Sequence, residues 1–176
     1  VANAEIVFSC LGNDSDVRDV ILATQQGKQG ALGHMQSGSI LVDHTTTSAD
    51  LARELAAQAA AMNCGFIDAP VSGGQQGAEN GQLTVMCGGN EQQFKQVESV
   101  INCYAKSVQL MGDTGSGQLC KMVNQICIAG LVQGLSEAIN FGMNAGLNMH
   151  DVIEVISKGA AQSWQMENRH KTMIED

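Results

Sequence analysis

Three short apolar runs alternate with helix-like segments in the first part of the chain, and this alternation restricts the fold more than any other feature. The runs are residues 6–11, 39–43 and 65–69, and turn-forming or polar residues follow each of them. Continuous apolar runs of this length are typical of parallel strands covered on both faces. Because parallel strands require crossover connections, the pattern predicts right-handed β-α-β units in a doubly wound sheet.

Start signals for the connecting helices lie between these runs. Asp14, Ser15 and Asp16 can cap a helix that reaches Leu22. Thr47 and Asp50 have the spacing of a capping box, and an alanine-rich helix is predicted to follow at residues 51–62.

The pattern changes after Pro70, the only proline of the chain. The sequence then predicts a glycine-rich loop, a strand, a helix and a strand, at residues 72–81, 83–87, 91–101 and 107–110. Residues 117–145 contain no helix breaker except isolated glycines, which indicates one helix of roughly 30 residues and about 45 Å. Two more helices are expected, at residues 149–157 and from residue 164 onward.

These segments together predict an α/β fold. We expect the C-terminal half of a Rossmann-like doubly wound sheet, followed by an all-helical domain that begins with one long helix. The boundary near Gly112 divides the chain into a partial dinucleotide-binding domain, residues 1–111, and a partial all-α substrate and dimerisation domain, residues 112–176.

Charge and composition argue against several classes of partner. The net charge is −9 with nine lysines and arginines, which disfavours nucleic acid and anionic lipid. No uninterrupted apolar run approaches the roughly 18 to 20 residues of a membrane span. Six scattered cysteines without a C-x-x-C pair, and four histidines without ligand spacing, predict free thiols and no metal site. We therefore expect a cytoplasmic protein without nucleic-acid or membrane partners.

The first candidate for chemistry is the segment D-A-P-V-S-G-G at residues 68–74. It follows the carboxyl end of a predicted parallel strand, where doubly wound sheets bind ligands. Its small residues expose backbone N–H groups and Ser72 adds a hydroxyl, so the segment can hold a carboxylate without a basic side chain. A flexible connector is the alternative interpretation.

The second candidate is Lys121 with Asn124 and Gln125, which share one helix face at i, i+3 and i+4 spacing. Apolar neighbours would partly desolvate the lysine and lower its pKa toward neutrality. Such a lysine can transfer a proton near pH 7, a role worth roughly 10² to 10⁴ in rate. Alternatively, Lys121 extends to solvent along an apolar helix.

Together the two motifs resemble the β-hydroxyacid dehydrogenase family, which includes 3-hydroxyisobutyrate dehydrogenase, tartronate semialdehyde reductase and glyoxylate/succinic semialdehyde reductase. The second motif is G-x-x-G-x-G-x-x-x-K-x-x-N from Gly112 to Asn124. The resemblance implies hydride transfer between NAD(P) and a small β-hydroxyacid or semialdehyde, with Lys121 as general acid/base. The residues implied to hold the small carboxylate substrate are Ser72, Gly73, Gly74, Asn124 and Gln125.

The same resemblance implies contacts with NAD or NADP. The family's Met-Leu-Pro turn is present as Cys10-Leu11-Gly12, and its Asp-x-Ser-Thr turn as Asp43-His44-Thr45-Thr46. Leu11, Gly12 and Thr46 would then lie near the cofactor. Glycine in place of proline and Thr45 in place of serine are departures, and they weaken the assignment of Gly12 more than that of Thr46.

Two parts of the family pattern lie outside this sequence. One is the G-x-G-x-x-G unit that holds the pyrophosphate, and the other is a set of helices beyond Asp176. We therefore expect an internal fragment that is inactive by itself. The residue that distinguishes NAD from NADP at the ribose 2′ position is also expected outside this sequence. The small residues Gly130, Gly134 and Ala138 recur every four positions, and we expect a homo-oligomer.

Two other functions stay open. A 6-phosphogluconate dehydrogenase-like enzyme would have His-Asn in place of Asn124-Gln125 and would need clustered cationic groups for a sugar phosphate. A dehydrogenase-like binding module without catalysis is the other alternative, against which the joint presence of Ser72, Lys121 and Asn124 argues.

Overall fold

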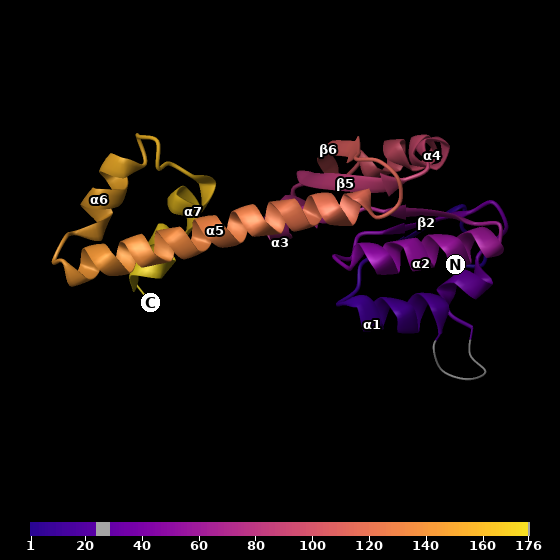
Figure 1. Ribbon diagram of the computed structural model, residues 1–176. Coiled ribbons are helices and arrows are strands. Elements are labelled where there is room, and N and C mark those ends of the chain that lie inside the picture. Colours follow the sequence, from indigo (N-terminus) through magenta and orange to yellow (C-terminus); the bar gives the residue numbers. More distant parts are fainter. Residues whose placement is uncertain (24–28, 176) are drawn as a thin grey trace. The chain divides into compact units, whose positions relative to one another are not determined.

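The computed structural model describes residues 1–23 and 29–175. It consists of two compact units, Val1–Met122 and Val123–Asp176. The first unit is a β-sheet with helices on both faces, and the second unit is helical (Figure 1). Helix α5, Ser116–Asn144, begins in the first unit and continues into the second.

Three parallel strands form one side of the sheet: β1 (Ile6–Ser9), β2 (Ile40–Asp43) and β3 (Gly65–Asp68). They confirm the predicted Rossmann-like arrangement. Every residue of β2 and β3 is buried, as expected of strands between two helical layers. The register pairs Asp43 with Asp68, so these two aspartates are neighbouring residues at the carboxyl ends of their strands.

The remaining strands make the sheet mixed. Strand β5 (Leu83–Gly89) runs antiparallel to β3, and it pairs antiparallel with β4 (Val71–Ser72) and parallel with β6 (Ala105–Leu110). The glycine-rich region expected as a loop thus contains β4 and a short helix, α3 (Gly74–Glu79). The loop prediction was wrong because two residues that pair with β5 leave no alternating pattern of their own.

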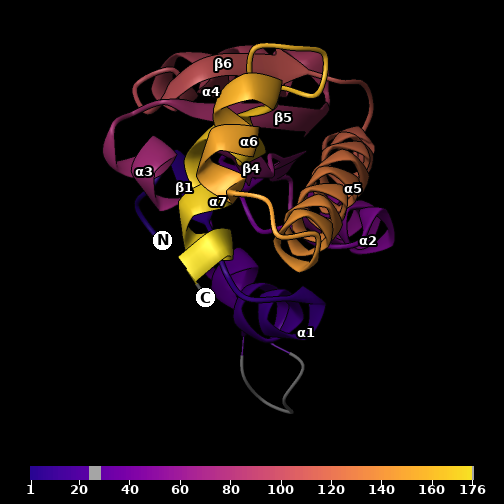
Figure 2. The same cartoon turned by 90° about the vertical axis from the view of Figure 1, so that its left-hand side faces the viewer.

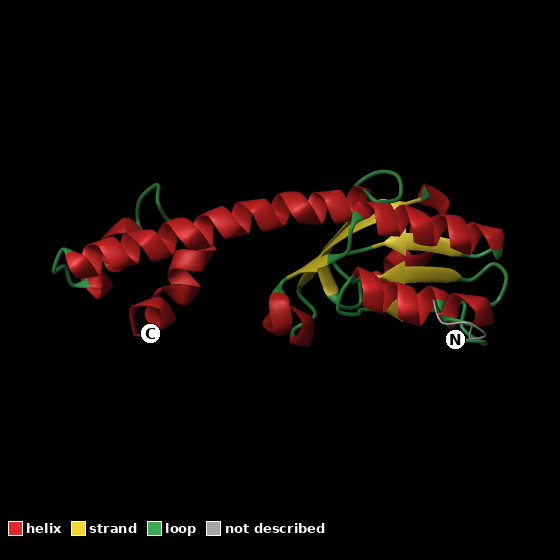
Figure 3. Ribbon diagram, turned by 60° about the horizontal axis from the view of Figure 1, so that its bottom comes forward, coloured by secondary structure: helices red, strands yellow, loops and turns green. Residues whose placement is uncertain are grey.

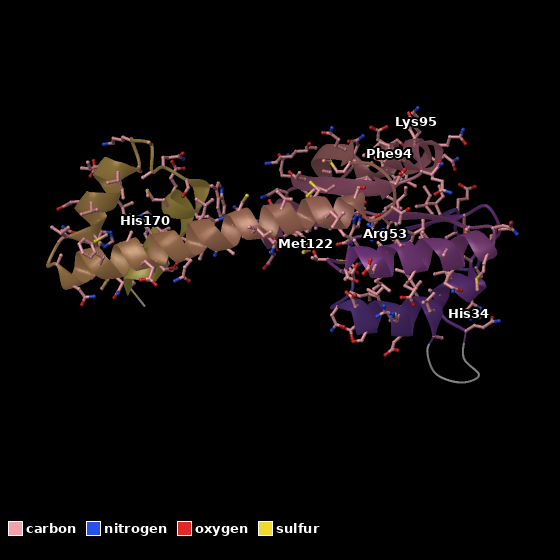
Figure 4. The ribbon with its side chains drawn as sticks, viewed as in Figure 1. His34, Arg53, Phe94, Lys95, Met122 and His170 are labelled. Atoms are coloured by element: carbon pink, nitrogen blue, oxygen red, sulfur yellow. The ribbon has the colours of Figure 1, made fainter. Side chains whose placement is uncertain are left out.

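Helices cover the two faces of this sheet (Figure 3). One face packs against α1 (Asp14–Val17), the short helical segments η1 (Arg18–Leu22) and η2 (Ala31–His34), and α2 (Ala49–Ala61). The other face packs against α4 (Glu91–Ile101). Leu41 and Val42 belong to different cores, as the alternation of side chains along a strand requires. On α4, Phe94 is buried in the core, and its neighbour Lys95 pairs with Glu91 at the surface (Figure 4).

Helix α5 has 29 residues and confirms the predicted long helix. By length and composition the helix is apolar enough to cross a membrane. The sequence analysis did not detect this property, because it considered only uninterrupted apolar runs. Its first turns pack on the sheet of the first unit, where Gln118 and Lys121 are buried, and Leu135 and Ile139 belong to the core of the second. Length and composition alone are weak evidence for a membrane span.

The second unit combines the rest of α5 with α6 (Met149–Ile156) and α7 (Trp164–Glu175), and Figure 2 shows the turn from α5 into α6. Its core consists of Leu135, Ile139, Met149, Ile153 and Met166. Gly130, Gly134 and Ala138 line an apolar cavity of about 290 Å³. A Cβ atom on Gly130 or Gly134 would meet no atom within 4 Å, so no close backbone contact explains these glycines in the described part of the chain.

Candidate functional site

Asp43 organises the turns that follow β1 and β2. Its carboxylate, which is 1% exposed, accepts hydrogen bonds from Ser9 Oγ at 2.9 Å and Thr45 Oγ1 at 2.6 Å. Thr45 Oγ1 in turn accepts from the backbone N–H of Leu11 at 2.8 Å. Burial raises the pKa of Asp43, and the bonds from Thr45 and Ser9 oppose the shift. The two turns that carry the predicted cofactor contacts are thereby tied together.

Of the predicted cofactor residues on these turns, Leu11 is half-buried against the core and the other two are exposed. Thr46 is exposed between Thr45 and Thr47, which are 2% and 5% exposed. Gly12 is exposed as well, and a Cβ atom there would collide with the Asp16 carboxylate. Leu11 and Thr46 therefore lie close together, because the Leu11 N–H is bound by the side chain of Thr45, the residue before Thr46.

Asp68 anchors the start of α5 to the carboxyl end of β3. Its carboxylate is fully buried and accepts from the backbone N–H groups of Gly115 at 2.7 Å and Gln118 at 3.0 Å. Burial raises the pKa of this carboxyl, against the effect of the hydrogen bonds from the start of α5. Arg53 of α2 lies beside the same turn (Figure 4). A Cβ atom added to Gly115 would be 3.4 Å from the guanidinium carbon of Arg53.

Gln118 joins the same turn of α5 to the loop after β2. Its side-chain Nε2 donates to the Thr45 carbonyl at 2.7 Å, and its Oε1 accepts from Thr47 N–H at 3.0 Å. The residue is 1% exposed. Asp68 and Gln118 therefore fix the beginning of the helix that carries Lys121 against two strand ends.

We expect Gln118→Ala to lower the free energy of unfolding by about 2 to 4 kcal/mol, because it leaves a buried N–H and a buried C=O without partners. Urea unfolding followed by circular dichroism measures the change. Gln133→Ala, at an exposed position of α5, is the matched control and should change the value by less than about 0.5 kcal/mol. Equal effects of the two substitutions would contradict the structural role of Gln118.

Lys121 lies on the turn of α5 that follows these anchors. It is 9% exposed, and burial lowers the pKa of its ammonium group below the usual value. The neighbouring Met122, labelled in Figure 4, ends the first unit. A lysine with a lowered pKa on a rigidly held helix has the properties required for proton transfer.

The substrate segment follows β3. Ser72 is half-buried in β4 and pairs with Thr84, whereas Gly73 and Gly74 are exposed at φ values of 137° and 61°. Met86 connects this segment with α5, because its N–H donates to the Pro70 carbonyl at 3.0 Å and its own carbonyl lies against Gly117. The segment and the start of the lysine helix are therefore neighbours within one unit.

Asn124 and Gln125 belong to the second unit. Their side chains bond to each other, with Asn124 Nδ2 donating to Gln125 Oε1 at 3.0 Å. Their contact with substrate, which the family resemblance implies, remains a prediction. The first unit contains the other predicted site residues, Leu11, Gly12, Thr46, Ser72, Gly73, Gly74 and Lys121.

The sequence analysis missed the buried polar residues that support the site: Asp43, Asp68 and Gln118. The sequence does contain a signal for the two aspartates, because each is the single charged residue at the end of an apolar run. Across the described residues, no cluster of three or more His, Cys, Asp or Glu side chains could hold a metal ion. All six cysteines are free thiols.

Comparison with known proteins gives consistent matches along the chain. Residues 1–112 match the family described as the NAD-binding domain of 6-phosphogluconate dehydrogenase. Residues 115–176 match the family described as NAD-binding of NADP-dependent 3-hydroxyisobutyrate dehydrogenase. Both halves therefore match domains that bind a nicotinamide cofactor.

Individual relatives agree with these matches. An uncharacterized oxidoreductase from Shewanella frigidimarina is 60% identical over 96% of this chain and 57% of its own length. A mitochondrial 3-hydroxyisobutyrate dehydrogenase-like protein from Arabidopsis thaliana is 43% identical over 91% of this chain and 47% of its own. The crystal structure of 3-hydroxyisobutyrate dehydrogenase from Salmonella typhimurium superimposes with a TM-score of 0.85 at 30% identity, over 99% of this chain and 59% of that one. The chain thus spans about half to three-fifths of the length of these proteins.

Proposed function

The chain belongs to the β-hydroxyacid dehydrogenase family of NAD(P)-dependent oxidoreductases, and from this premise we propose that its enzyme interconverts a small β-hydroxyacid and the corresponding semialdehyde. We assign residues 1–111 to the dinucleotide-binding domain and residues 112–176 to the substrate domain. The observation that carries the proposal is the buried Lys121, placed one turn after an anchor that fixes α5 to the carboxyl ends of the parallel strands.

Lys121 is proposed as the general acid/base. In the reducing direction its ammonium group stabilises the alkoxide that develops on the substrate oxygen and then donates a proton to it. In the oxidising direction the neutral amine accepts the hydroxyl proton. The lowered pKa of Lys121 supports both roles, because it brings the neutral form within reach at a lower pH than an exposed lysine would allow.

The turns after β1 and β2 are proposed to hold the nicotinamide half of NAD or NADP. When bound, the nicotinamide supplies the hydride transfer. Leu11 is fixed through Thr45 and Asp43, and the next residue after Thr45, Thr46, is exposed and free to meet a ligand. The role of these residues is orientation, which can contribute a large part of the rate.

The substrate carboxylate is proposed to bind at Ser72 and the backbone of Gly73 and Gly74. Small residues leave the main chain open there, and the hydroxyl of Ser72 can donate. From the family resemblance, Asn124 and Gln125 are proposed to help fix the substrate. We also propose that the enzyme is cytoplasmic and forms a homo-oligomer.

The proposal is tested with a longer protein that contains these residues. We expect it to oxidise NADH or NADPH in the presence of small semialdehydes, followed by absorbance at the nicotinamide band. Activity with 6-phosphogluconate but none with any β-hydroxyacid or semialdehyde would overturn the proposed substrate class.

Ser72→Ala in that enzyme should raise the substrate KM by about tenfold or more. A hydrogen bond to a charged group contributes on the order of 1.5 to 3 kcal/mol, and 1.4 kcal/mol corresponds to a factor of ten. Ser107→Ala, at an exposed position of β6, is the control and should leave the KM unchanged. A normal KM for Ser72→Ala would assign the carboxylate to other groups.

The 176-residue chain by itself should bind NAD and NADP weakly and reduce no semialdehyde at a measurable rate. Leu11 and Thr46 address only the nicotinamide half, and these residues contain no G-x-G-x-x-G turn for the pyrophosphate. In the described residues β1 pairs only with β2, so its free edge should favour self-association. Titration calorimetry and light scattering test the two statements, and micromolar binding by a monomer would contradict both.

A further inference from the structure

The imidazole of His44 connects the loop after β2 with the residue that follows β3. Its Nδ1 lies 2.6 Å from the Ala69 carbonyl oxygen, and its Nε2 lies 2.8 Å from the Tyr104 hydroxyl. A carbonyl can only accept, so Nδ1 carries the hydrogen. In the neutral ring Nε2 is then unprotonated and accepts from the Tyr104 hydroxyl. The two contacts together select one tautomer.

Aromatic packing holds the same ring in its orientation. Phe8 of β1 stacks on His44 with centroids 5.7 Å apart and planes 18° apart. Tyr104 meets both rings edge-on, at 5.6 Å from His44 and 6.2 Å from Phe8. Burial lowers the pKa of His44, while its bond to Ala69 and the charge of Asp43 act in the opposite direction. The ring is thus fixed by two hydrogen bonds and two ring contacts.

Ala69 depends on this arrangement because it is the first residue after β3, at the start of the substrate segment. It is fully buried, and its N–H donates to the Asp43 carbonyl at 2.8 Å. The carbonyl oxygen of Ala69 accepts from the side chain of His44, which follows Asp43 in the sequence. Both backbone groups of Ala69 are therefore held by two successive residues of the segment that also carries Thr45 and Thr46.

We propose that His44 is a positioning residue that fixes the start of the substrate segment, residues 69–74, relative to the cofactor loop at Thr45 and Thr46. The spacing between these two segments sets the distance between the cofactor and the bound carboxylate, so this part rests on the proposed function. His44 touches neither ligand in the proposal. It acts through Ala69.

The test on the 176-residue chain uses nitrogen-15 NMR of the imidazole and amide hydrogen exchange. We expect wild-type His44 to be neutral with the hydrogen on Nδ1. His44→Leu should accelerate exchange at the amides of Ala69 and Met86 by about tenfold or more, with the amides of α2 unchanged as an internal control. His44→Asn, which can place an N–H near the position of Nδ1, should restore most of the protection. A ring protonated on Nε2 alone, or unchanged exchange in His44→Leu, would overturn the proposal.

Tyr104→Phe keeps the ring contacts and removes the hydroxyl donor, so it provides a milder variant if His44→Leu does not fold. It should retain protection at Ala69 and lower the dominance of the Nδ1–H tautomer, and an unaltered imidazole spectrum would contradict the assigned bond. In a longer, active enzyme His44→Leu should raise the substrate KM by about tenfold at nearly constant cofactor KM, with recovery in His44→Asn. Absence of any dehydrogenase activity would sink the proposed function, while the NMR and exchange results would still decide the role of His44 in the chain.

Discussion

Replacing Lys121 with alanine in a longer, active enzyme should lower turnover by at least about 10²-fold and leave folding and nicotinamide binding nearly intact. General acid/base catalysis by a positioned side chain contributes roughly 10² to 10⁴ in rate. Lys121 is buried on α5, whose start is held by Asp68 and Gln118 rather than by the lysine, so alanine should not disturb the anchor. Steady-state rates, a melting curve and a cofactor titration measure the three quantities.

The pH dependence gives a second readout of the same residue. Because burial places the pKa of Lys121 below its usual 10.5, reduction should slow as the pH rises through that lowered value, and oxidation should speed up. The arginine of Lys121→Arg keeps its proton and its positive charge throughout this pH range. The change of rate with pH should therefore disappear in this variant. Near-normal activity of Lys121→Ala would exclude the proposed general acid.

Gly117→Ala should lower the free energy of unfolding by at least about 3 kcal/mol. A Cβ atom at this position would overlap the Met86 carbonyl and lie 2.8 Å from both the carbonyl and the carboxylate of Asp68. Overpacking costs roughly 1 to 3 kcal/mol, and displacement of the Asp68 bonds to Gly115 and Gln118 adds a comparable amount. Urea unfolding followed by circular dichroism measures the loss.

Gly134→Ala on the same helix is the matched control, and its effect should have the opposite sign. Gly134 is exposed, and a Cβ atom there would meet nothing within 4 Å. Alanine in place of glycine in a helix interior stabilises by up to about 1 kcal/mol. If Gly117→Ala were as well tolerated as Gly134→Ala, the close approach of α5 to β5 would be incorrect.

The strands β1, β2 and β3 and the helix α5 could be predicted, because the signal for each lies within one continuous stretch of sequence. Apolar runs of strand length and a long segment without helix breakers are local signals, and the structure has both. Element boundaries were less predictable. Thr47 was expected to cap the helix that became α2, but the cap is Ser48, whose side chain accepts from Leu51 N–H at 3.1 Å. The Thr47 N–H instead donates to the side chain of Gln118.

The support of the candidate site could not be predicted because it depends on pairs that lie far apart in the chain. Asp68 meets Gly115 across 47 residues, and Gln118 meets Thr47 across 71. Pattern and spacing singled out Lys121 and Ser72, and the family resemblance supplied their roles. Neither indicated which residues hold these two in place.

The buried anchors of α5 also determine how the proposed enzyme could be engineered. Gln75 and Gln76 lie exposed on α3, immediately after the substrate segment, so a mutant library at these positions would sample new side chains at little cost in stability. A library that includes Asp68 or Gln118 would instead return mostly unfolded clones, because each holds several backbone groups in the interior. Selection for altered substrates should therefore find its solutions on α3, with the strand ends unchanged.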